Sequence, residues 1–151
     1  MKSTSKQQGK SPFIAALWAV MSMLWPARVC VANTGYDTGG NIRAYAADVS
    51  RLNRTGAKKV ISGVCASACT MYLGVKNVCI EPDAEVWFHA AHLPGDHRPD
   101  PLGSLQMLSY YPKKVRAWAI QVGALEGTEW DGASVLTGRQ LIRMGLTRCR
   151  K

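Results

Sequence analysis

Acidic side chains are scarce in this sequence: 10 Asp and Glu stand against 19 Lys and Arg, a formal net charge of +9 at pH 7. Such a balance is common in nucleic-acid-binding proteins, but the chain lacks an aromatic-basic ladder and any known nucleic-acid motif. Its basic residues are spread out, in short clusters at 58–59, at 113–114 and in the C-terminal tail. We therefore expect no nucleic-acid partner, and a solvated basic surface that tolerates acidic envelope polymers.

The sequence also lacks internal repeats and a comfortable membrane-spanning run. Its apolar stretch at 13–25 is shorter than the roughly 20 residues that a transmembrane helix needs, and it follows Lys2, Lys6 and Lys10. This order is typical of a secretory signal. We expect residues 1–27 to be a signal peptide and 28–151 to form one exported domain, periplasmic or extracellular. The alternative is an uncleaved N-terminal anchor in the inner membrane, which would be the only membrane contact.

Five cysteines are present, and disulfides are favoured over free thiols in a short exported chain. Cys30 lies beside the leader, which leaves four candidates for two bridges: Cys65, Cys69, Cys79 and Cys149. Cys65 and Cys69 are four residues apart and would share a face of a regular helix, where a direct bridge is awkward. We therefore expect each of them to pair with Cys79 or Cys149.

A zinc site is a further use for these side chains, because zinc prefers sulfur and imidazole ligands. Cys65, Cys69, His89 and His92 would be its ligands. Export disfavours free thiolates, so we expect no metal and no cofactor. A thiol-based function is a separate alternative.

After the leader, strand and helix patterns alternate. The expected strands are 28–32, 59–62, 77–80 and 85–88. The expected helices are an amphipathic one from 42 to Gly56, a buried one at 67–73, one beginning at Pro112, and one at 138–144. Residues 92–103, rich in proline and glycine, are expected to form a loop. This order predicts a single α/β domain with a mainly parallel sheet and flanking helices.

Ser67 follows a strand pattern and begins a helix pattern, a position that suits a nucleophile. The amide of Ala68 would then be an oxyanion donor, with Gly39 or Gly40 as a second donor because a glycine backbone approaches a ligand closely. His89, at the end of another apolar run, would be the base. The alternatives are a Ser67 that caps a helix, a His89 that bonds a carbonyl, and an Asp131 that only begins an Asp-Gly turn.

Three segments together resemble the Clp-protease/crotonase superfamily: Asp-Thr-Gly-Gly at 37–40, Cys-Ala-Ser-Ala-Cys at 65–69, and Trp-Phe-His at 87–89. Clp peptidases have a Ser-Pro-Gly-Gly turn, then a Gly-x-Ala-Ala-Ser-Met-Ala nucleophile segment, then an Ile-His, in the same order and with similar spacing. The small exported Clp-like proteins of bacteria carry a Cys-x-Ser-Ala-Cys version of this motif.

The resemblance implies a crotonase-type β-β-α core and a serine hydrolase of the bacterial envelope that acts on a peptide or acyl bond. Ser67 would be the nucleophile and His89 the base. The family's aspartate position falls on Ala133, so Asp131, two residues earlier, is the candidate for the third triad member. An early strand pair of the family is missing, and we expect a second copy of the chain to cover the open sheet edge. The alternative is a non-catalytic envelope protein that keeps the fold for binding or assembly.

Overall fold

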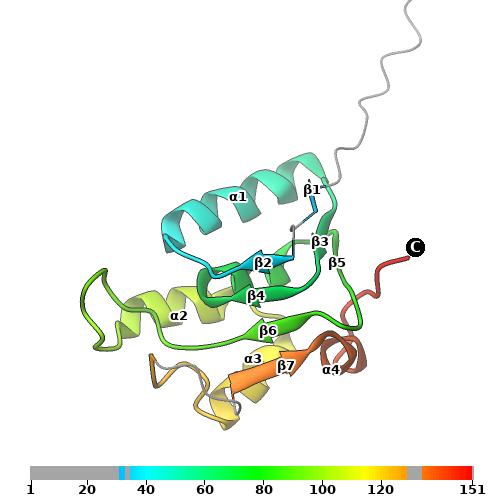
Figure 1. The fold of residues 1–151 in the computed structure, drawn as a ribbon. Helices are drawn as coiled ribbons and strands as arrows, with labels where there is room; N and C mark the ends of the chain where they lie inside the picture. The colour runs from blue at the N-terminus through cyan, green and yellow to red at the C-terminus, as the bar shows by residue number, and fades with distance from the viewer. Residues whose placement is uncertain (1–30, 33–34, 129–133, 151) are drawn as a thin grey trace, which may run out of the picture.

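The computed structural model describes residues 31–32, 35–128 and 134–150 (Figure 1). Its first half contains strands β1 (Val31–Ala32) and β2 (Tyr36–Asp37), helix α1 (Ile42–Thr55), strands β3 (Lys59–Ile61) and β4 (Val64–Ala66), and the 3-10 helix η1 (Ser67–Gly74). Its second half contains β5 (Val78–Ile80), β6 (Glu85–Trp87), α2 (Pro101–Ser109), α3 (Lys113–Gln121), β7 (Val135–Thr137) and α4 (Gly138–Arg143). The domain is α/β, as the sequence predicts.

The described strands form two small sheets, and successive strands along the chain alternate between them up to β6. One has the order β1-β3-β5 and the other β2-β4-β6-β7, and every pairing is parallel except β6 with β7. The chain passes three times from the first sheet into the second, as β1-β2, β3-β4 and β5-β6, and a helix follows each passage. At the second corner Gly63 has φ +59, and a Cβ there would lie 2.0 Å from the carbonyl oxygen of Gly35. Only glycine fits this turn.

The core lies between the second sheet and the helices. Cys65, Val86 and Leu136 are neighbours across β4, β6 and β7, and all three are buried, whereas Tyr36 on the opposite face is 73% exposed. Figure 1 shows α2 and α3 behind this sheet and α1 running along β2. Phe88 stands edge-on to the rings of Tyr111 and Trp118, at centroid distances of 5.3 and 5.2 Å. Such pairs stabilise a core beyond their buried area.

Helix α1 forms as the periodicity predicts. Asn41 accepts hydrogen bonds from the amides of Arg43 and Ala44 at the helix start, and Gly56 ends the helix with φ +67. Val49 and Leu52 of its apolar stripe are fully buried. The amphipathic prediction is confirmed for this helix.

Helix α2 corrects the predicted loop at 92–103, because the helix begins at Pro101. Asp100 accepts a hydrogen bond from the amide of Leu102, and Pro101 occupies the first turn, where it needs no amide partner. Gly103 packs against Ala91, where a Cβ would lie 2.8 Å from that of Ala91. Pro101 and Gly103, which the sequence pattern assigned to a loop, therefore begin a helix and pack closely on Ala91, respectively.

Two disulfides join the four described cysteines, as predicted in number, but the predicted pairing is wrong. Cys65 bonds to Cys69, and Cys79 bonds to Cys149. A direct bridge between these two residues is awkward only on a regular helix, whereas Cys65 lies in β4 and the chain turns sharply at Ser67. That turn brings the two Cα atoms to 5.4 Å, a normal spacing for a disulfide. The second bond fastens the C-terminal tail to β5, where Cys149 also donates its amide to the carbonyl of Ile80.

Candidate active site

Ser67 stands at the junction of β4 and η1 in a left-handed backbone conformation. Its φ is +55, and no other non-glycine residue among those described has a positive φ. For a residue with a Cβ this conformation costs about 1–2 kcal/mol, and such residues are concentrated at functional sites. Ala66, not Ser67, occupies the capping position of η1, which removes the helix-cap interpretation of the serine.

The glycine turn after β2 packs directly on this junction. A Cβ added to Gly39, whose φ is +82, would lie 2.7 Å from Ser67 Cβ, from the amide nitrogen of Ala68 and from the carbonyl oxygen of Ala66. No larger residue leaves room for this contact. Gly39 donates its own amide to Asp37 Oδ1 at 3.0 Å, so the adjacent Gly40 is the better candidate for a donor into the site.

Thr70 and Tyr111 form hydrogen bonds next to Ser67. Thr70 Oγ1 donates to the carbonyl oxygen of Ser67 at 2.6 Å and lies 2.7 Å from the hydroxyl of Tyr111. Burial raises the pKa of Tyr111, so this hydroxyl stays neutral at ordinary pH. Sequence reasoning missed this pair, because a threonine and a tyrosine 41 residues apart carry no local pattern.

His89 follows β6, the strand that pairs with β4. Ala66 lies opposite Trp87 in that parallel ladder, so Ser67 and His89 leave the same edge of the sheet one and two residues later. His89 is 3% exposed, and its Nδ1 lies 2.7 Å from the carbonyl oxygen of Ala90. A carbonyl can only accept, so Nδ1 carries a proton, and in the neutral imidazole this leaves the lone pair that a general base needs on Nε2.

Ser67 and His89 line one cavity of about 660 Å³. It opens at the carboxyl ends of β2, β4 and β6, where ligands bind in open α/β sheets. Its remaining lining comes from the turn after β2, the start of α1, the segment after β6, and α2: Thr38, Gly39, Gly40, Asn41, Ile42, Arg43, Ala91, His92, Leu93, Pro94 and Gln106. Among the described residues no carboxylate lines it. The structure therefore gathers Ser67, His89, Gly39 and Gly40, with Ala68 directly beneath them.

All three histidines of the chain stand in a row that leads out of this cavity. The ring of His92 lies 5.9 Å from that of His89, and the ring of His97 lies 6.3 Å from that of His92. The segment 92–97 is therefore close to the candidate base. The row was not expected, because His92 and His97 fall in a predicted loop.

Asp131, the predicted orienting acid, lies outside the described residues. Asp37, a carboxylate at the end of β2, is engaged elsewhere: its Oδ1 accepts from the amide of Gly39 and, at 2.5 Å, from the hydroxyl of Tyr45. Burial, together with the bond to Asp37, raises the pKa of Tyr45. Asp37 thus fixes the glycine turn, a role that no sequence pattern indicated.

The alternative uses of the cysteines lose their basis in this arrangement. Both Cys65 and Cys69 are consumed in a disulfide, so neither is a thiolate ligand for zinc or a free reactive thiol. Within the described part of the chain, no group of three or more side chains is placed to hold a metal ion.

Neither protein-family models nor curated protein sequences give a match to this chain. In the described residues, no helix is both long and apolar enough to cross a membrane.

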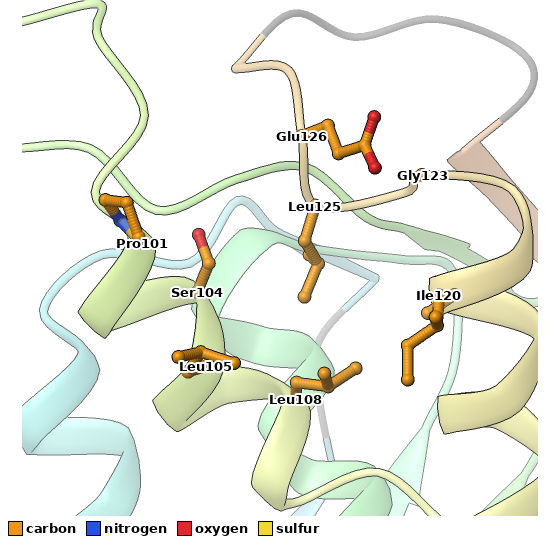
Figure 2. Close-up of a pocket in the computed structure, with 9 residues that line it drawn as sticks. Pro101, Ser104, Leu105, Leu108, Ile120, Gly123, Leu125 and Glu126 are labelled. Carbon is orange, nitrogen blue, oxygen red and sulfur yellow. The ribbon is translucent and has the colours of Figure 1, made fainter.

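A second hollow lies on the other side of α2. It is an apolar groove of about 370 Å³ between α2 and α3, and Figure 2 shows Leu105, Leu108, Ile120 and Leu125 converging on it. Ser104 and Glu126 are its only polar side chains among the described residues. Ser104 Oγ accepts the amide of Ala91 at 2.9 Å, so it is committed to the segment that lines the first cavity. The groove holds no candidate nucleophile.

Proposed function

We propose that the protein is a serine hydrolase that cleaves a peptide or acyl bond through an acyl-enzyme at Ser67. One observation carries the proposal: a serine in a left-handed conformation lines the same cavity as a buried histidine whose Nδ1 bonds to a carbonyl oxygen. A conformation of this kind persists only where the surrounding structure enforces it, and such residues are concentrated at functional sites.

The proposed chemistry follows from these positions. Nε2 of His89 takes the proton of Ser67 Oγ as the oxygen attacks the scissile carbonyl carbon. The amides of Ala68 and Gly40 stabilise the oxyanion that forms, because they are fixed before the reaction begins. His89 then gives this proton to the leaving group. A water molecule next attacks the acyl carbon while His89 takes its proton, and return of that proton to Ser67 Oγ releases the acid. Asp131 stays the proposed orienting acid for His89.

The order of elements supports a finer assignment of the fold to the Clp/crotonase type. Three successive units, β1-β2-α1, β3-β4-η1 and β5-β6-α2, repeat a β-β-α pattern, and each contributes one strand to each sheet. Ser67 begins the helix of the second unit, where the resemblance places the nucleophile. This assignment agrees with the sequence motifs at 37–40 and 65–69.

We also propose an exported, oxidising location and assembly with a second copy of the chain. Two disulfides in one domain support the location, because they persist outside the cytoplasm. The assembly rests on the short edge strand β2, which has a single neighbour, β4, among the described strands. Light scattering of the purified protein tests it, and a monomer at micromolar concentration would contradict it.

A fluorophosphonate probe tests the hydrolase directly, since it reacts with an activated serine. We expect stoichiometric labelling of the oxidised protein, loss of labelling in Ser67→Ala, and full labelling in the matched control Ser109→Ala, whose hydroxyl donates to the carbonyl of Gln106 within α2. A folded wild-type protein that takes up no probe would contradict the hydrolase and favour the non-catalytic envelope protein.

A further inference from the structure

The Cys65–Cys69 disulfide brackets Ser67 two residues on either side. Both cysteines are fully buried, while Ser67 between them is partly exposed at the cavity. The bond therefore closes a short loop, residues 65–69, that contains the proposed nucleophile and its proposed oxyanion donor, Ala68. A bond in this place constrains local backbone more than it constrains the whole chain.

The conformation of Ser67 needs such a constraint. A left-handed serine is unfavourable by itself, and a 3-10 helix that begins at the same residue offers it no capping bond. The Thr70 hydroxyl holds only the carbonyl end of Ser67. Gly39 packs closely against Ser67 and the amide of Ala68, but this contact is not covalent. The disulfide is the one covalent link that fixes both ends of the turn.

We propose that the Cys65–Cys69 disulfide is a positioning device for the proposed nucleophile: it holds Ser67 at positive φ and the Ala68 amide beside Gly39, and the Cys79–Cys149 bond has no such role. The inference rests on the proposed function for its catalytic meaning, but the backbone claim stands apart from it. The two cysteines touch no substrate, so they are positioning residues and not catalytic ones.

The two disulfides provide a matched test. We expect Cys65→Ala/Cys69→Ala to slow fluorophosphonate labelling roughly 10²-fold, the effect of misplacing a reacting group by about 1 Å. Its melting temperature should fall less than that of Cys79→Ala/Cys149→Ala, because the first bond spans 4 residues and the second spans 70. The second variant should label within about twofold of wild type at a temperature where both are folded.

An NMR measurement makes the test independent of activity. The intraresidue nuclear Overhauser effect between the amide and Hα protons of Ser67 is strong at positive φ, and we expect it in wild type and in Cys79→Ala/Cys149→Ala but not in Cys65→Ala/Cys69→Ala. If the wild type takes up no probe, the hydrolase fails while this signal still decides the positioning claim. Should the alanine pair fail to fold, Cys65→Val/Cys69→Ala retains more of the buried volume. A folded variant without this bond that keeps both the wild-type rate and the strong signal overturns the inference.

Discussion

The cavity around Ser67 and the groove between α2 and α3 share one wall, helix α2, yet they differ in chemistry. The cavity forms where parallel strands end, and strand ends present backbone amides, turns and polar side chains to one point. The groove forms where two helices meet, and their backbone groups are already bonded within each helix, so mainly apolar side chains line it beside Ser104 and Glu126 (Figure 2). The proposed reaction is therefore assigned to the cavity, where backbone polar groups remain available, and not to the apolar groove.

The largest expected effect separates the two hollows by activity. His89→Gln removes the proposed base while it keeps a polar side chain of similar size, and it should slow labelling of Ser67 by about 10²- to 10⁴-fold. Leu105→Gln, which places the same side chain in the groove at a position 60% exposed, should leave the rate within about twofold. The two rates, measured with one fluorophosphonate at one pH, check the contrast. Similar losses in both variants would mean that the groove takes part in the reaction.

Two glycines with positive φ give the next largest contrast. Gly39→Ala meets the backbone of Ala66 and Ala68 at 2.7 Å, whereas Gly123→Ala, beside the groove, meets only the carboxylate end of Glu126 at 2.8 Å. The positive φ alone costs about 1–2 kcal/mol at either site. Because backbone cannot move aside, Gly39→Ala should lose about a further 1–3 kcal/mol of unfolding free energy, and also its labelling.

Urea unfolding of both glycine variants measures these losses. Gly123→Ala should keep wild-type labelling, since the flexible Glu126 side chain can swing away. Equal destabilisation of the two variants would show that the close approach of Gly39 to Ser67 adds no loss of unfolding free energy beyond that of the positive φ.

A smaller effect comes from the hydroxyl beneath the serine. Tyr111→Phe removes the partner of Thr70 Oγ1 and should lower the unfolding free energy at pH 7 by about 0.5–1.5 kcal/mol. Burial raises the pKa of Tyr111 above its unfolded value of 10.0, so the neutral form stabilises the fold fully below pH 10 and this stabilisation is lost as pH rises further. The wild-type protein should therefore lose up to about 1.4 kcal/mol per pH unit more than Tyr111→Phe above pH 10.

Urea titrations at pH 7, 10 and 11 give that difference directly. An identical alkaline loss in Tyr111→Phe would assign the effect to other buried tyrosines, such as Tyr72, whose pKa is also raised by burial and by its bond to Asp48.

The sequence was sufficient for features that depend on near neighbours. The stripe of α1 and its stop at Gly56 follow from a 3.6-residue period and one glycine, and both are found. The approach of Ser67 and His89 to one cavity could be predicted because both end apolar runs, and strand ends meet at one edge of a parallel sheet. The fold class follows from the same alternation of patterns.

Features set by tertiary contact could not be predicted. The Cys65–Cys69 bond depends on the left-handed φ of Ser67, which no propensity assigns to a serine. Strand β7 has three residues, and its Leu136 pairs antiparallel with Val86 of β6, 50 positions earlier in the chain, so no local alternation marks it. Asp100 and Pro101 begin α2, and the close packing of Gly103 on Ala91 is a tertiary contact that a proline- and glycine-rich pattern does not reveal.

The smallest expected effect concerns charge at the rim of the cavity. Arg43 lines the Ser67 cavity and is exposed, and no described carboxylate lines that cavity to oppose it. A solvated charge of this kind changes binding by about 0.3–1 kcal/mol, so an ester with a free carboxylate should react about 2- to 5-fold faster than its neutral analogue. Arg43→Gln should remove that preference, as should high salt, because solvent-exposed charges are screened. Glu126→Gln in the groove is the matched control, and a preference that survives in Arg43→Gln would place the source of the field elsewhere in the basic surface.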